Sequence, residues 1–209
     1  MPTLEKMIDG FKIYKATTHE KQKDLIIHQE QAGVRPTTLV ITSSDLHISP
    51  DTLMGCTPGD LYLIRLKAGL VPPFSPELNG FTATLEYAIK YHKVNNILVL
   101  GHTHNDGLEM VLKGGHTTSD SDPLKAWLGV ANEVAQAVNE QMKDYSDAEK
   151  NRAMELETIV MNIRNLFSYP DIQEQVNQGK LEIYGWHFDV ESGQLLGFMP
   201  NDGTFAPIE

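Results

Sequence analysis

Hydrophobic positions along the first third of the chain change from helical spacing to short apolar runs. Residues 3–32 predict two helices, because apolar side chains recur there at intervals of three and four positions. Gly33 and Pro36 end that segment. The β-branched residues at 37–42 are typical of a buried strand. A short helix is predicted at 49–55, a turn at Pro58-Gly59-Asp60 and a strand at 61–65.

The rest of the chain repeats this alternation. Residues 97–100, Ile-Leu-Val-Leu, are the clearest buried strand. A last long strand is predicted at 181–190, and Ser192-Gly193 can turn it into a hairpin with 194–199. Helices are predicted at 79–91, 106–113, 123–142, 147–167 and 170–178. Strands separated by helices indicate an α/β fold with a central, mainly parallel sheet flanked by helices.

Polar residues follow two of the predicted strands at the edge where such sheets bind ligands. Ser43, Asp45 and His47 come after the first strand and share one face if the chain stays extended. Gly101-His102-Thr103-His104-Asn105 follows the strand at 97–100. If both strands are parallel, the two segments open at the same edge and form a candidate site.

These segments resemble the motifs of β-class carbonic anhydrases in order and spacing. That family has Cys-x-Asp-Ser-Arg after one strand and Gly-His-x-x-Cys after a later one. The resemblance covers roughly residues 25–200 and implies the β-carbonic anhydrase fold. It rests on Thr42–Ile48, Pro58-Gly59-Asp60-Leu61, Leu85-Glu86-Tyr87-Ala88, Gly101–Asn105 and Gly185–Asp189.

The differences from the family fall on its zinc site. The resemblance implies that zinc is held by both motif cysteines and the second motif's histidine, with an Asp–Arg pair orienting the bound hydroxide. Here the cysteine positions are Ser43 and Asn105, and the arginine position is His47. Only Asp45 and His102 match. Losing two thiolates removes charged, soft ligands from the metal. We therefore expect a degenerate zinc site, without normal carbon dioxide hydration and with no cofactor or weakly bound zinc.

The residues also admit other chemistry. Asp45, His102 and His104 offer hard ligands for a rebuilt site holding zinc or another divalent metal, which would make the protein a metal-dependent carbonic anhydrase or related hydrolase. His47 beside Asp45 is a candidate catalytic base. Alternatively, His47 and Asp45 form a polar pair in place of the family's Asp–Arg contact. Ser43 as a nucleophile is the third interpretation. Asp106, Gly107 and Arg65 are predicted to line the pocket. Cys56 precedes the second strand, so we expect it at the opposite end of the sheet.

Composition limits the binding partners and the cellular compartment that we expect for the protein. The formal net charge of −11 disfavours nucleic acid and anionic membranes. With one cysteine and no apolar run long enough for a signal or a membrane span, we expect a single cytoplasmic domain over residues 1–209. The resemblance implies a homodimer or tetramer, with residues 1–35 packed on a partner subunit. A small anion such as bicarbonate, or another small molecule, is the expected ligand.

Overall fold

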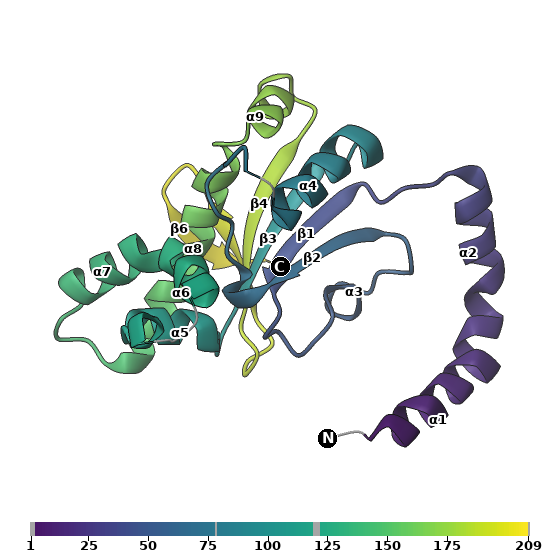
Figure 1. Cartoon of the computed structure of the whole chain (residues 1–209), viewed down its shortest axis with the longest axis horizontal. Helices are drawn as coiled ribbons and strands as arrows, with labels where there is room; N and C mark the ends of the chain where they lie inside the picture. The colour runs from purple at the N-terminus through teal and green to yellow at the C-terminus, as the bar shows by residue number, and fades with distance from the viewer. Residues whose placement is uncertain (1–2, 78, 119–121, 209) are drawn as a thin grey trace.

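A six-stranded sheet forms the centre of the computed structural model, which describes residues 3–77, 79–118 and 122–208 (Figure 1). The strand order is β2-β1-β3-β4-β5-β6. The first four strands in this order are parallel, and the last two are antiparallel additions at one edge. The strands are β1 (Thr38–Ser43), β2 (Leu61–Leu66), β3 (Asn96–His102), β4 (Glu182–Phe188), β5 (Leu195–Met199) and β6 (Thr204–Pro207).

The pairing of β1 with β3 confirms the prediction on which the candidate site depends. Val40 lies opposite Leu98 and Ile41 opposite Val99 in a parallel register. Both strands therefore end at the same edge, with Ser43 as the last residue of β1 and His102 as the last residue of β3.

The helices follow the predicted pattern with one clear difference. The segment expected as one helix at 123–142 is divided into α6 and α7 by a short 3₁₀ turn, Gly129–Ala131, since glycine weakens a helix interior. The sequence analysis also did not anticipate β6. The helices are α1 (Leu4–Tyr14), α2 (Glu20–Ala32), α3 (Pro50–Leu53), α4 (Gly80–Tyr87), α5 (Asp106–Leu112), α6 (Asp122–Leu128), α7 (Asn132–Gln141), α8 (Asp147–Leu166) and α9 (Pro170–Asn177).

The two faces of the sheet are covered unequally. On one face, Leu39, Ile41, Ile97 and Val99 pack against side chains of α4, α8 and α9 in the main core. On the other face, Val40, Leu98 and Leu100 are buried, with α3 supplying part of the cover. Several apolar side chains around this second cluster are only half-buried: Leu61, Leu63, Trp186, Phe188 and Leu195. A third cluster joins α5, α6 and α7 to α8.

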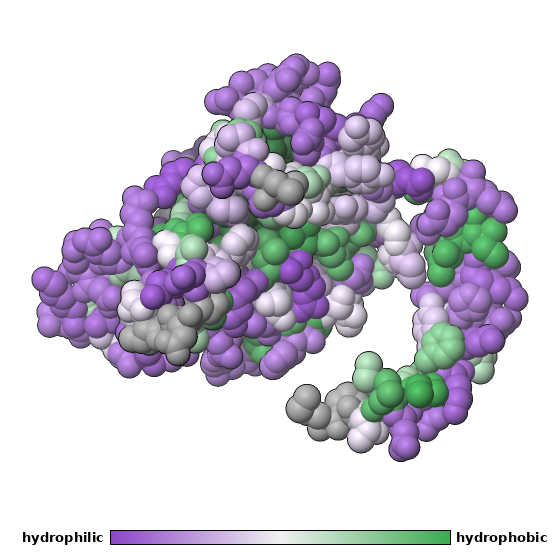
Figure 2. All heavy atoms as spheres, in the orientation of Figure 1, coloured by the Kyte–Doolittle hydropathy of each residue, from purple (hydrophilic) through white to green (hydrophobic). Residues whose placement is uncertain are grey.

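The first two helices form an arm that extends from the body of the molecule (Figure 1). A π-helical turn, Lys15–His19, joins α1 to α2, and neither helix buries a residue. The arm's exposed apolar side chains gather along the concave side of its arc (Figure 2). The exposed apolar residues of α1 and α2 include Leu4, Met7, Phe11 and Ile27. Among the described residues, no helix is long and apolar enough to cross a membrane.

The long helix α8 packs against the sheet over two glycines. A methyl group added to Gly101 on β3 would lie 2.7 Å from Ile159 Cδ1, and one added to Gly185 on β4 would lie 2.7 Å from Ile159 Cγ2. Both distances are too short for carbon atoms in contact. Glycine at these positions therefore lets α8 lie close enough to carry Glu155 and Thr158 to the carboxyl end of β3.

This close packing generates a prediction. The Gly185→Ala substitution should lower the free energy of unfolding by about 1–3 kcal/mol, because the core must shift to accommodate the new methyl group. Gly80→Ala is the control, since nothing lies within 4 Å of the added carbon there. Urea unfolding of both variants measures the difference. Equal free energies of unfolding would show that α8 and the sheet can shift to accommodate the methyl group at little cost.

Candidate functional site

Ser43 ends β1 at the centre of the candidate site. It is fully buried, and its Oγ accepts a hydrogen bond from the backbone N–H of Asp45 at 3.0 Å. This contact belongs to a turn at Ser44 and Asp45, so the extended chain ends at Ser43. The expectation that Ser43, Asp45 and His47 share one face of an extended strand is therefore wrong, and His47 is exposed.

Asp45 is paired with a cation that the sequence analysis did not single out. Its Oδ2 lies 2.7 Å from Lys67 Nζ, in a part-buried ion pair. Lys67 follows β2, so the pair joins the loop after β1 to the loop after β2. Arg65, on β2, also contacts the first of these loops by donating from Nη2 to the carbonyl oxygen of Leu46. Lys67, and not His47, thus balances the Asp45 carboxylate.

His102 ends β3 and is 2% exposed. Its Nδ1 lies 2.7 Å from the carbonyl oxygen of Thr103. A carbonyl can only accept, so Nδ1 carries a proton. An imidazole this buried avoids an unpaired charge by staying neutral, so Nε2 keeps its lone pair. That Nε2 is buried and has no hydrogen-bond partner among the residues that the structure describes. Burial is the main cause that lowers the pKa of His102, against the opposing effects of the Thr103 carbonyl and Glu155. The imidazole is therefore held neutral.

Both polar atoms of the Asn105 side-chain amide form hydrogen bonds with the backbone. Its Oδ1 caps α5 by accepting from the N–H of Leu108, and its Nδ2 donates to the carbonyl oxygen of Ala68, both at 3.3 Å. The residue is 4% exposed. Gly107 is also buried, and an added Cβ there would lie 2.7 Å from that of Ala68, so glycine permits this close approach. Asn105 thus fastens α5 to the loop after β2.

The remaining predicted residues lie apart from this centre. His104 has a left-handed backbone, with φ of 60°, and its exposed ring lies 3.0 Å from the Glu191 carboxylate. Asp106 is exposed in the first turn of α5. A small cavity brings together Ser43, His102 and Asn105, but Asp45, His104 and Cys56 do not line it.

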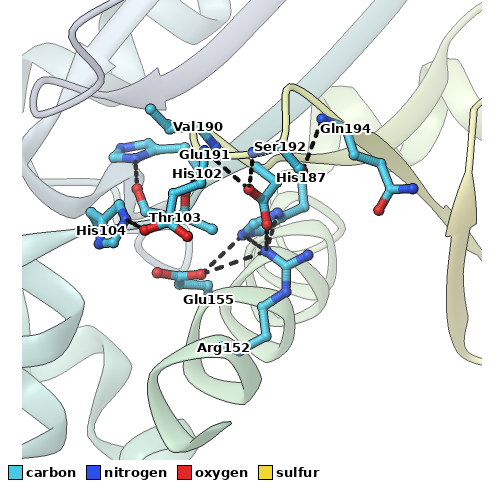
Figure 3. A network of polar contacts seen from close by, with 11 residues as sticks. His102, Thr103, His104, Arg152, Glu155, His187, Val190, Glu191, Ser192 and Gln194 are labelled. Atoms are coloured by element: carbon cyan, nitrogen blue, oxygen red, sulfur yellow. Dashed lines mark hydrogen bonds and ion pairs between the residues drawn. The ribbon is translucent and has the colours of Figure 1, made fainter. Parts of the chain in front are cut away.

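A second polar cluster, which the sequence analysis missed, lies beside His102 (Figure 3). His187 on β4 is fully buried, with Nε2 3.1 Å from Glu155 Oε2 and Nδ1 2.8 Å from Arg152 Nη1. Arg152 Nη1 also lies 3.1 Å from Nε2, but the Glu155 carboxylate only accepts, so Nε2 donates to Glu155 and Nδ1 accepts from Arg152. Arg152 also lies 3.7 Å from Asp189. Hydrogen bonds from the turn after β4, mainly from the Ser192 N–H, lower the pKa of Asp189.

The donor set at the centre does not fit zinc. Of the three side chains in the family's ligand positions, only His102 presents a free donor atom that zinc prefers. Ser43 and Asn105 are neutral, and their polar atoms are engaged with the backbone. Among residues 3–77, 79–118 and 122–208, no three His, Cys, Asp or Glu side chains are grouped so that they could hold a metal ion.

The double engagement of Asn105 can be tested by its contribution to stability. Asn105→Ala should lower the free energy of unfolding by about 1–3 kcal/mol, because the cap of α5 and the buried bond to Ala68 are both lost. Asn79 caps α4 through the Thr82 N–H at 2.8 Å but is less buried. Asn79→Ala should therefore lower the free energy of unfolding by less than Asn105→Ala in the same assay. A smaller loss at Asn105 than at Asn79 would contradict the structural role given to Asn105.

Comparisons with known proteins identify the family of the chain. The family model described as carbonic anhydrase matches residues 38–195. A carbonic anhydrase from Synechococcus elongatus is 31% identical, over 92% of this chain and 71% of its own length. Carbonic anhydrase 1 of Escherichia coli O157:H7 is 28% identical over 98% of this chain and 92% of its own.

Solved structures show the same fold. The β-carbonic anhydrase CcaA superposes with a TM-score of 0.92 at 24% identity, covering 99% of this chain and 92% of its own. A tetrameric β-carbonic anhydrase of Sordaria macrospora gives a TM-score of 0.79 at 23% identity, covering 99% of this chain and 100% of its own. With the family model and the Synechococcus relative, these findings show that the chain belongs to the β-class carbonic anhydrase family.

Proposed function

We propose that this protein is a β-carbonic anhydrase homologue that has lost normal zinc-dependent carbon dioxide hydration and binds a small molecule instead. The observation that carries the proposal is the state of the two cysteine positions. Ser43 and Asn105 are buried, neutral and hydrogen-bonded to the backbone. A zinc ion there would meet one imidazole and no thiolate, so its affinity would be far below that of a cysteine-ligated site.

A rebuilt metal site is the less favoured alternative. It needs Asp45 and His104 to turn toward His102. The Asp45 carboxylate is already bonded to Lys67, and the His104 ring lies near Glu191 at the surface. Both contacts would have to break before these side chains could share an ion with His102.

A cleft next to the centre is the best place for a small ligand. It lies between the loop after β3, α5, the first turns of α8 and the turn after β4, with a volume of about 340 Å³. Carboxylates outnumber cations on its walls, so a bicarbonate ion would be repelled and a neutral or cationic molecule fits better. The charged side chains there are Glu109, Glu155, Asp189 and Glu191, with Arg152 opposite in charge.

Metal content and thiol restoration test the loss of zinc chemistry. The parent protein should carry well under one zinc per chain and hydrate carbon dioxide no faster than background in stopped-flow assays. Ser43→Cys with Asn105→Cys should bind zinc much more tightly than the parent, with each single variant between them, because two thiolates then face His102.

A matched control separates this effect from simple thiol content. Ser44→Cys with Asn105→Cys also adds two cysteines, but Ser44 is exposed and lies outside the cavity. Its zinc affinity should stay near that of the single Asn105→Cys variant. Stoichiometric zinc in the parent after dialysis against a chelator would refute the proposed loss.

Self-association through the arm is the second part of the proposal. The apolar side chains of α1 and α2 are exposed, and one sheet face keeps half-buried apolar residues, so a second subunit would cover surface that a lone chain leaves in water. One of the structural neighbours is described as tetrameric. We infer a homodimer or tetramer in which each arm packs on a partner.

Sedimentation measures this association directly. The full chain should sediment as a dimer or larger. Met7→Asp with Phe11→Asp should shift it toward monomer, because two charges then replace apolar side chains that are 60% and 62% exposed in the single chain. Tyr91→Asp, at another exposed aromatic of 71% exposure, should leave the assembly unchanged. A monomeric parent would remove this part of the proposal.

A further inference from the structure

The cavity at the family's metal position has the size of one water molecule. Its volume is about 10 Å³, and its polar lining is Ser43, His102, Asn105, Glu155, Thr158 and Asn162. That space is about the minimum for one water.

Two buried polar atoms, on residues that line this cavity, have no hydrogen-bond partner among the described residues. They are His102 Nε2 and Thr158 Oγ1, and both residues are 2% exposed. His102 and Thr158 come from different elements, β3 and α8, yet both contribute to the wall of the same small space. Buried polar groups in native proteins are almost always hydrogen-bonded, to protein or to ordered water. Two unpaired polar atoms on residues of the same cavity therefore indicate a bound molecule.

The available hydrogen-bonding roles define that molecule. In the neutral, buried His102 ring the proton is on Nδ1, which hydrogen-bonds the Thr103 carbonyl, so Nε2 carries a lone pair and the occupant must donate to it. The Thr158 hydroxyl both donates and accepts. Within the same wall, Asn105 and Asn162 are already bonded to backbone groups. A molecule that donates a hydrogen bond to His102 Nε2 and forms another with Thr158 Oγ1 satisfies both unpaired atoms.

Charge favours a neutral occupant over a cation. Among the described residues, Glu155 is the only carboxylate on the wall of this cavity, and its Oε2 already lies 3.1 Å from His187 Nε2 and 3.9 Å from Arg152 Nη1. Ser43, Asn105, Thr158 and Asn162 are neutral. A cation would therefore give up its hydration for few compensating charges.

We propose that this cavity holds one ordered water molecule, which donates to His102 Nε2 and hydrogen-bonds Thr158 Oγ1. The water completes the polar core at the carboxyl ends of β1 and β3, where the family's metal would lie. This inference goes beyond the proposed function, because it concerns the inner cavity and holds whatever the adjacent cleft binds.

Histidine-labelled NMR of the full chain tests the proposal. The His102 ring should show a protonated Nδ1 and an unprotonated Nε2 whose ¹⁵N shift is that of a hydrogen-bonded lone pair. Its ring protons should show cross-relaxation with a long-lived water. Thr158→Val keeps the side-chain shape but removes the hydroxyl, and should weaken the water signal and move the Nε2 shift. Thr158→Ser should restore both.

Thr42→Val is the matched control. Thr42 is also buried and donates to the Leu100 carbonyl at 2.8 Å, but it does not line the cavity. This variant loses a buried hydrogen bond while leaving the His102 signals as they are in the parent.

Three results would overturn the proposal. A parent protein with no long-lived water at His102 would mean that the cavity is empty. His102 signals that change on dialysis against a chelator would mean that a metal is bound there. Signals that change with added ammonium chloride would mean that the occupant is ammonium, a cation of similar size.

Discussion

The need to satisfy polar groups buried at the carboxyl ends of β1 and β3 governs this region of the molecule. Parallel pairing brings the ends of both strands to one edge, and α8 covers it closely because Gly101 and Gly185 lack side chains. Polar side chains enclosed there have little access to bulk water, and an unpaired one is costly. Ser43 and Asn105 meet this constraint with backbone groups, where the family's pattern has a metal and two thiolates.

Charge follows the same logic. Two thiolates and a zinc ion would neutralise each other, so exchanging the cysteines for neutral residues also removes the need for a cation. The Asp45 carboxylate, which faces an arginine in the family, is balanced by Lys67 from the neighbouring loop. The buried Glu155 carboxylate accepts a hydrogen bond from His187 and forms an ion pair with Arg152. Each of these two carboxylates thus has a partner from this chain, and the Asp45–Lys67 and Glu155–His187 contacts join elements that are far apart in sequence.

Much of the fold could be predicted from sequence because its signals are local. The apolar runs at 37–42 and 97–100 identified the two strands, and helical spacing identified α8. Position within the chain also placed Ser43, His102 and Asn105 at one edge, and the cavity contains all three. Residue type and motif spacing were sufficient for these points.

The partners of those residues could not be predicted in the same way. Lys67 lies 22 positions from Asp45, and its side chain could have pointed to solvent, so no local pattern marks the pair. His187 sits in an ordinary strand sequence, and only the packing of α8 reveals that it is buried against Glu155. The exposed position of His47 follows from a turn at Asp45 that residue types alone do not require. Side-chain pairing across the fold depends on tertiary geometry, which a periodic pattern does not contain.

The separation between core and site explains how the fold can persist without the family's ligands. The main core is built from side chains of β1, β3, α4, α8 and α9 on one face of the sheet, and none of Ser43, His102 or Asn105 belongs to it. Hydrophobic burial there does not depend on which atoms lie at the strand ends. A metal site at the edge would contribute its own binding free energy, so losing it would remove that contribution and leave the apolar core intact. The constraint that stays at the edge is hydrogen bonding, which backbone groups and short polar side chains can meet without a metal.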